Sequence, residues 1–171
     1  MGLTNNLTVF LNFAKEGVDK AVLLGKCFCC IHVVNTYFCS LVLGYGPSML
    51  PTISSSSSLL LAERVSHRFN NVGPGDIVIV RSPEVPTKVV IKRVIGLEDD
   101  RVSYVVDPKN SEKSETVVVP KGHIWVEGDN IYDSNDSRNF GAVPYGLLQG
   151  KVFWRIWPPK DFGSLQQRAD K

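Results

Sequence analysis

The chain has 171 residues, and its hydrophobic content of 43% allows one compact domain with length left for an anchor or a tail. Its 19 Lys and Arg residues against 17 Asp and Glu residues give a formal net charge of +2. This small excess argues against a dedicated nucleic-acid binder, which would carry a strongly basic face.

An uncharged run, "CFCCIHVVNTYFCSLVLG", occupies residues 27–44. As a helix it would be about 27 Å long, at about 1.5 Å per residue, which is just enough to cross the hydrocarbon core of a bilayer. We therefore expect a transmembrane anchor at 27–44, preceded by an N-terminal segment at 1–26. His32 and Asn35 weaken this interpretation, and a helix buried in the protein core is the alternative.

The charges before the run predict its orientation. Lys15, Lys20 and Lys26 outnumber Glu16 and Asp19 in the preceding segment. Because positively charged flanks stay on the cytoplasm-like side of a membrane, the rest of the chain is expected on the opposite side.

All four cysteines of the chain lie inside the same run. They therefore cannot cross-link the remainder of the chain as a disulfide framework. They also lack the paired spacing of a zinc site. We expect no metal and no cofactor.

From residue 59 onward the sequence is typical of strands. Six short segments are rich in Val and Ile and are separated by Gly, Pro and Asp: 59–65, 75–81, 88–97, 100–106, 115–120 and 123–129. We expect a mostly β domain of antiparallel sheets at 45–160. A serine-rich loop is expected at 54–58, helical turns at 143–150, and a poorly ordered tail at 161–171.

The segment "GYGPSMLPT" holds Ser48 in a stiffened backbone. Pro47 and Pro51 fix their own φ angles and restrict the residues before them. The segment is not a nucleophile elbow, because Leu50 stands where that motif needs glycine. A Ser-His-Asp triad would have to use His67 or His123, and nothing in the sequence near either histidine marks it as a base.

The segment "KVVIKRVIG" places two cations on opposite faces of one strand. Side chains alternate, so Lys92 shares an apolar face with Val90 and Val94, whereas Arg93 points to the other side. A buried arginine keeps its charge and needs a carboxylate. A buried lysine has a lowered pKa, and its neutral amine can then act as a general base. A lysine that reaches solvent at a sheet edge is the alternative.

The segment "EGDNIYDSNDSRNFG", at 127–141, is rich in Asp, Asn and Ser. By itself it is typical of a loop in which these side chains bond to their own backbone. It lacks the final glutamate of an EF-hand, which argues against calcium. It could instead supply carboxylates for Arg93 and hydroxyl groups near a catalytic centre.

These segments, in this order, resemble the type I signal peptidases, which are Ser/Lys proteases of membranes. The matching motifs are Ser48-Met49-Leu50-Pro51-Thr52, Gly75-Asp76, Lys92-Arg93-Val94-Ile95-Gly96, Gly128-Asp129-Asn130 and Ser134-Asn135-Asp136-Ser137-Arg138. The resemblance covers about residues 27–157. It is strongest to the subunit 1 branch of the mitochondrial inner membrane peptidases, because Asn130 and Arg138 are kept.

The resemblance implies a role for each matched residue. Ser48 would be the nucleophile, Lys92 the general base, and Ser134 the hydroxyl that orients the lysine amine. A salt-bridge network would hold the strand that bears the lysine, formed by Asp129, Asp136, Arg93 and Arg138.

The oxyanion hole departs from some bacterial relatives, which have a serine where this chain has Gly46. Since Pro47 has no N–H, the Ser48 backbone amide would be the one donor that the sequence identifies.

The function that the resemblance implies is removal of sorting sequences from precursor proteins, through an acyl-enzyme, close to the membrane. It implies the mitochondrial inner membrane, with the catalytic domain in the intermembrane space. It also implies a heterodimer with a homologous second subunit. Two alternatives are an inactive membrane-tethered β-domain that serves as a partner subunit, and a LexA-like self-cleaving protein. The LexA-like reading lacks a DNA-reading module, since the N-terminal segment is short and apolar.

Overall fold

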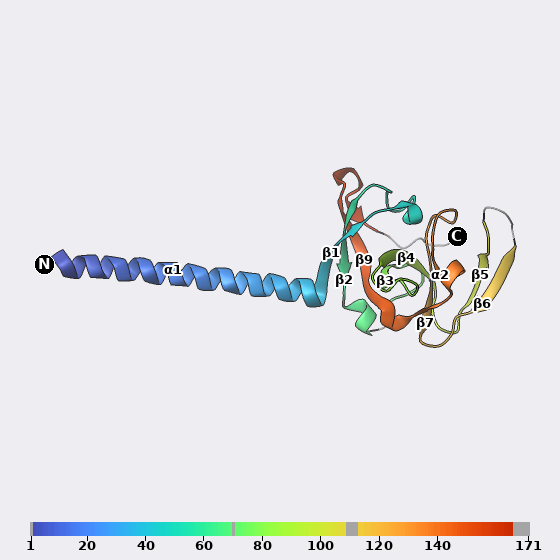
Figure 1. Ribbon diagram of the computed structural model, residues 1–171, viewed down its shortest axis with the longest axis horizontal. Helices are drawn as coiled ribbons and strands as arrows, with labels where there is room; N and C mark the ends of the chain where they lie inside the picture. Colours follow the sequence, from blue (N-terminus) through green and yellow to red (C-terminus); the bar gives the residue numbers. More distant parts are fainter. Residues whose placement is uncertain (1, 70, 109–112, 166–171) are drawn as a thin grey trace. The chain divides into compact units, whose positions relative to one another are not determined.

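A computed structural model describes residues 2–69, 71–108 and 113–165 (Figure 1). The chain divides into two units at Phe38 and Cys39. The first unit is a helix, α1, at Gly2–Val33, which continues as a π-helical turn at Val34–Phe38. Its segment Asn12–Phe38 is long and apolar enough to cross a membrane.

The side chains of this segment are not buried in the protein. Leu24 and Phe28, for example, are each 71% exposed. None of the residues in the most apolar window is buried, which argues against the core-helix alternative.

The helix ends earlier than the sequence analysis expects. Residues Cys39–Gly44 form strand β1, so the prediction of a helix throughout 27–44 is wrong for its last six residues. All six pair with β2 at Ser58–Glu63. A short uncharged run is compatible with a strand as well as with a helix. Here the segment forms a strand because its backbone pairs with β2. The whole of β1 therefore separates the helix from the segment that carries Ser48.

The second unit is mostly antiparallel β, as predicted. Its remaining strands are β3 at Ile77–Arg81, β4 at Val89–Gly96, β5 at Arg101–Val105, β6 at Ser114–Val118, β7 at His123–Glu127, β8 at Val143–Pro144, β9 at Leu148–Trp157 and β10 at Gly163–Ser164. A short helix, α2, spans Ser137–Phe140. The main sheet has the order β1-β2-β9-β3-β4-β7-β8, with β10 added to β9. Strands β5 and β6 form a separate two-stranded sheet, which stands apart from the main sheet in Figure 1.

All six strands predicted from the sequence are present, and the structure adds the long strand β9, which the sequence pattern does not predict. Of the turns expected at 143–150, Tyr145–Leu147 is a 3₁₀ turn. The tail is ordered at its start, contrary to expectation, because β10 pairs with β9. Residues 166–171 lie outside the described residues. The serine loop is shorter than expected, since Ser58 is buried and begins β2.

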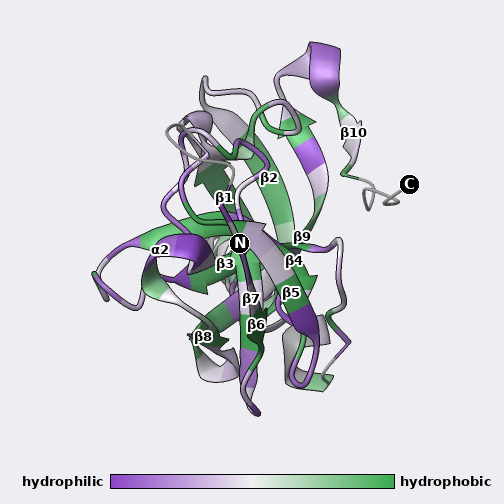
Figure 2. Cartoon of the chain, turned by 90° about the vertical axis from the view of Figure 1, so that its right-hand side faces the viewer, coloured by the Kyte–Doolittle hydropathy of each residue, from purple (hydrophilic) through white to green (hydrophobic). Residues whose placement is uncertain are grey.

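Strand β3 lies at the centre of the sheet and is buried on both faces. Val78 and Val80 belong to one hydrophobic cluster, which extends to β4, β7 and β8. Ile77 and Ile79 belong to a second cluster, which includes Met49 and residues of β2 and β9. Figure 2 shows hydrophobic residues concentrated in the strands and hydrophilic residues mainly in the connections. β4, which pairs with β3, can therefore present side chains to a different interior on each face.

The outer face of β1, β2 and β9 is apolar. Residues paired across antiparallel strands share a face. One row across the three strands consists of Leu41, Leu61 and Trp154, and the next row of Leu43, Leu59 and Trp157. Leu43 is 60% exposed and Trp157 56% exposed.

Candidate active site

Lys92 lies in β4 on the face that it shares with Val90 and Val94, as the alternation of side chains predicts. It pairs with Val78 of β3, and the residue is only 3% exposed. Its amine does not reach solvent at a sheet edge, which was the alternative. Lys92 Nζ instead donates a hydrogen bond of 2.8 Å to Ser134 Oγ.

Burial lowers the pKa of Lys92 to about 8. Desolvation is the largest cause, because it penalises the charged amine. The carboxylate of Asp136 opposes this by raising the pKa, and the guanidinium of Arg138 adds to the lowering. A large fraction of this lysine is therefore neutral at mildly alkaline pH, as a general base requires.

The Ser134 hydroxyl bridges the Lys92 amine and a buried carboxylate. Its Oγ donates to Asp136 Oδ2 at 2.6 Å while it accepts from Lys92. A hydroxyl with a donor on one side and an acceptor on the other has one orientation. This arrangement fixes the direction of the lysine amine.

Asp136 is fully buried and is held by several donors. It accepts a hydrogen bond of 2.8 Å from the Gly128 N–H. It also accepts hydrogen bonds of 2.9 Å and 2.6 Å from Nε and NH2 of Arg138. Burial raises the pKa of Asp136, but the hydrogen bonds from Arg138, Gly128 and Ser134 outweigh it and hold the pKa below its ordinary value. The carboxylate also caps α2 by accepting from the Arg138 N–H.

Arg93 points to the opposite face of β4, as predicted. Its Nε and NH2 donate to the two oxygens of Asp129, each at 2.7 Å, and its NH1 donates to Gly75 O at 2.7 Å. NH2 also reaches Thr52 Oγ1 at 3.3 Å. The four charged residues therefore form two separate buried pairs, Arg93 with Asp129 and Arg138 with Asp136, on either side of β4.

Replacing Asp129 with asparagine should destabilise the domain by about 3–5 kcal/mol, because Arg93 would be left as an uncompensated buried charge. Both side chains are almost completely buried. Chemical denaturation of the full-length protein in detergent would measure the change. The matched control is Glu115→Gln, which removes an exposed pair with Lys113 and should leave the denaturation midpoint unchanged. Equal midpoints for Asp129→Asn and wild type would contradict the prediction.

Ser48 lies in a 3₁₀ turn at Pro47–Met49, separated from the end of β1 by two residues. The next residue, Met49, is buried in the second hydrophobic cluster and anchors the turn. Ser48 itself is partly exposed. The sequence thus places an accessible hydroxyl on a backbone held by a core side chain.

Gly128 brings the Ser48 turn and the lysine together. A Cβ atom on Gly128 would lie 2.2 Å from Ser134 Oγ and 2.5 Å from Ser48 O. The two oxygens are thus separated by no more than the sum of these distances. Asn130 N–H also donates to Ser48 O at 3.0 Å. Within the described part of the chain, no direct hydrogen bond joins Ser48 Oγ and Lys92 Nζ; such bonds are often long in free enzymes and shorten when substrate binds.

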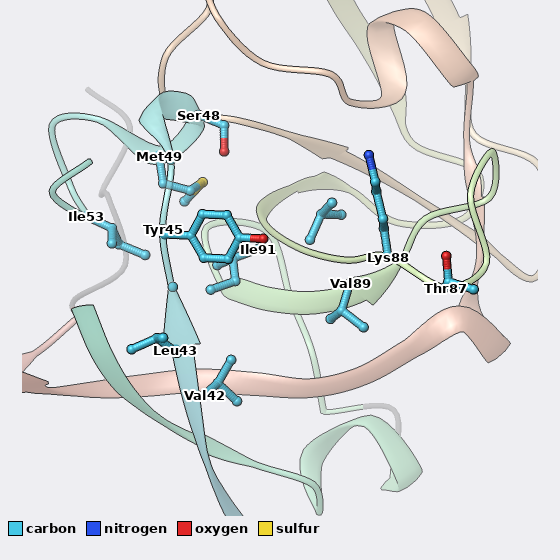
Figure 3. Close-up of a pocket in the computed structure, with 13 residues that line it drawn as sticks. Val42, Leu43, Tyr45, Ser48, Met49, Ile53, Thr87, Lys88, Val89 and Ile91 are labelled. Carbon is cyan, nitrogen blue, oxygen red and sulfur yellow. The ribbon is translucent and has the colours of Figure 1, made fainter. Parts of the chain in front are cut away.

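A groove of about 430 Å³ opens beside Ser48. It is lined by residues from the end of β1, the Ser48 turn and the start of β4: Val42, Leu43, Gly44, Tyr45, Gly46, Ser48, Met49, Ile53, Thr87, Lys88, Val89, Val90 and Ile91. Figure 3 shows Ser48, Met49 and Tyr45 on one side of this groove, and Lys88 and Val89 on the other. Its lining is mainly apolar.

The groove lies between two strand edges. β1 is the last strand of the sheet on its side and pairs only with β2. Over Val89–Lys92, β4 pairs with β3, and its pairing with β7 begins at Arg93. Among the described strands, neither edge has a second partner here. An extended peptide could therefore bond to both edges.

Of the two histidines considered as a base, the described one, His123, does not line this groove. His123 Nδ1 donates to Lys121 O at 2.9 Å, and His123 lines a different cavity, together with Leu97 and Tyr145. The side chain of His67 lies outside the described residues. His123 is therefore not placed to serve Ser48.

Three residues near the site make contacts that the sequence does not predict. Gly128 provides the close approach of the Ser48 turn, and Asn130 bonds to that turn. Thr52 accepts from Arg93 through its hydroxyl, and its carbonyl accepts from Arg155 at 2.8 Å. All three stand in the matched motifs, but the motifs do not say which distant residue each one contacts.

The comparison with protein families gives the class of protein to which this fold and this site belong. The chain matches the family described as "Signal peptidase, peptidase S26" over residues 19–109 and 105–157. The chain belongs to this signal peptidase family.

Within this family, the chain is similar to proteins named as mitochondrial inner membrane proteases. "Mitochondrial ATP-independent inner membrane protease subunit 1b" of Arabidopsis thaliana is 49% identical, over 95% of this chain and 97% of the relative. "Mitochondrial inner membrane protease subunit 2" of Danio rerio is 43% identical, over 70% of this chain and 63% of the relative. A crystal structure of a signal peptidase I from Enterococcus faecalis has 28% identity and a TM-score of 0.40, covering 46% of this chain and 94% of that one.

Proposed function

We propose that this chain is a serine endopeptidase, anchored in the mitochondrial inner membrane, that removes sorting sequences from precursor proteins. The observation that carries the proposal is the buried Lys92 amine, with its lowered pKa, held beside the turn that presents Ser48 to a groove. The relatives named as mitochondrial inner membrane proteases support the location, and the signal peptidase family supports the substrate class.

In the first half-reaction, neutral Lys92 takes the proton of the Ser48 hydroxyl. Ser48 Oγ attacks the scissile carbonyl carbon, and the Ser48 N–H stabilises the charge that develops on the carbonyl oxygen. The carbon–nitrogen bond then breaks as the Lys92 ammonium gives its proton to the leaving amine. The N-terminal part of the precursor remains as an ester on Ser48.

In the second half-reaction, Lys92 is neutral again and takes a proton from water. The resulting hydroxide attacks the ester, and Ser48 leaves with the proton from Lys92. Ser134 and Asp136 would hold the amine in one place throughout, because the hydroxyl bridges Lys92 and the buried carboxylate.

The substrate would bind as an extended strand between β1 and the start of β4. Backbone groups on the two edges would hold its main chain, and the apolar lining would accept apolar side chains. The proposed cleavage takes place near the membrane surface, because β1 follows the candidate span directly in the sequence.

The proposal includes a catalytic domain in the intermembrane space, and the excess of lysine before the uncharged run that begins at residue 27 supports this orientation. Relatives carry both subunit names of the inner membrane protease, which supports a heterodimer with a homologous second subunit.

The pH dependence of cleavage tests the proposal. Lys92 acts as a base only when deprotonated, so activity should be present above its pKa of about 8 and lost as the pH falls through that value. Well below pH 8, kcat should fall about tenfold per pH unit. The measurement is single-site cleavage of a presequence-bearing precursor by the full-length protein in detergent, from pH 5.5 to 9.5.

The precursor should carry no titrating group near the cleavage site, so that the acid limb reports the enzyme. A limb centred near 6.5 would indicate a histidine base and contradict the Lys92 assignment. No cleavage at any pH, with the second subunit present or absent, would favour an inactive partner subunit.

A further inference from the structure

Asn130 bonds to two successive carbonyls of the Ser48 turn. Its backbone N–H donates to Ser48 O at 3.0 Å, and its side-chain Nδ2 donates to Pro47 O at 3.1 Å. The remaining side-chain atom, Oδ1, accepts from the Tyr132 N–H at 3.2 Å, which fixes the orientation of the amide group. One residue from a loop more than eighty positions away thus holds the turn.

The bond to Pro47 O determines the direction of a second group. The peptide between Pro47 and Ser48 is trans, and in a trans peptide the C=O and the N–H point in opposite directions within one plane. When Asn130 and the Leu50 N–H fix the Pro47 carbonyl, the Ser48 N–H is fixed as well. It points away from Asn130, and no hydrogen bond occupies it within residues 2–69, 71–108 and 113–165.

We propose that Asn130 is a positioning residue whose side-chain amide orients the Ser48 N–H as the oxyanion donor. The inference rests on the proposed function, because it presupposes Ser48 as nucleophile. Gly46 has no side chain and Pro47 has no N–H, so neither can donate to the oxyanion. Stabilisation of the oxyanion therefore depends more strongly on the direction of the Ser48 N–H. The bond from the Asn130 backbone docks the turn, and the bond from its side chain sets the rotation of the peptide plane.

The test uses Asn130→Asp, which keeps the shape and the acceptor for Tyr132 but loses the donor to Pro47 O. The backbone bond to Ser48 O remains, so the turn stays docked. The probe is a fluorogenic peptide chosen from a library because the full-length wild-type protein cleaves it. We expect kcat to fall about 10–100-fold with KM unchanged, since an oxyanion contact forms only in the transition state.

A second readout separates orientation from simple structure. The aldehyde of the same peptide forms a tetrahedral adduct with serine and so uses the oxyanion donor. Its affinity should weaken by the same factor as kcat/KM, whereas the affinity of an uncleavable ground-state peptide should not change. The acid limb near pH 8 should stay in place, because Lys92 is not altered. Asn130→Ala, which adds no charge, should show the same pattern if the aspartate variant folds poorly.

The matched control is Asn139→Asp, an exposed asparagine of α2 whose side chain bonds to Asn135. It should behave as wild type. Wild-type kcat in both Asn130 variants would overturn the inference while leaving the proposed function intact. A raised KM, or a lower melting temperature with unchanged kcat, would also overturn it. If the wild-type protein cleaves no peptide and no precursor, the proposed function fails and the inference fails with it.

Discussion

Precursor cleavage should fall at least about 10³-fold when Ser48 is replaced by alanine or Lys92 by methionine. Alanine removes the attacking oxygen. Methionine keeps the length and apolar stem of the lysine, so it fits between Val90 and Val94 but cannot accept a proton. The double variant should be no slower than the slower single variant, because the two groups act in one step.

The measurement is the initial rate of precursor processing by purified full-length protein, at pH 9 where the wild-type lysine is mostly neutral. Ser57→Ala and Lys113→Met are the controls, since both alter exposed residues and should retain wild-type rates. Cleavage by both site variants would rule out the protease proposal. Full activity in Lys92→Met alone would reject the lysine as base and return the histidines to consideration.

A single methyl group at Gly128 should reduce kcat by about 10² or more. The added Cβ would meet Ser134 Oγ at 2.2 Å and Ser48 O at 2.5 Å. The serine hydroxyl cannot rotate away without losing its bonds to Lys92 and Asp136, and the carbonyl is backbone. The Ser48 turn must therefore move away from the lysine, and a shift of about 1 Å in reacting groups can lower a rate by about 10²-fold.

Gly146→Ala is the matched control, because an added Cβ there has no atom within 4 Å. Overpacking at Gly128 should also lower stability by about 1–3 kcal/mol, so the assay is run well below the melting temperature. A near-wild-type kcat for Gly128→Ala would show that the approach of the turn to Ser134 is not needed for catalysis.

The opposite placement of Lys92 and Arg93 could be predicted from sequence, because side chains alternate along any strand. That alternation also predicted an interior on each face, and β3 provides it with Val78 on one side and Ile77 on the other. The two carboxylate partners could be predicted as a group, since one loop contains them. Their division into two separate pairs could not, because the loop passes on both sides of β4.

Features that depend on long-range packing were not predictable. The sequence predicts a helix at β1, because a short run without charges has no period that separates a strand from a helix. The contact from Asn130 to Pro47 joins positions 83 residues apart, and no local pattern marks it. The role of Gly128 is set by the atoms that surround its missing side chain, which only the folded chain defines.

The apolar outer face of β1, β2 and β9 has a practical consequence for obtaining the enzyme. A fragment that begins at Cys39 would lose the helix but keep Leu41, Leu43 and Trp157 on its surface. Contiguous apolar surface on an edge strand promotes self-association in water. Starting the fragment later would remove β1, which borders the groove. We therefore expect deletion of the helix to leave a protein that still needs detergent for purification.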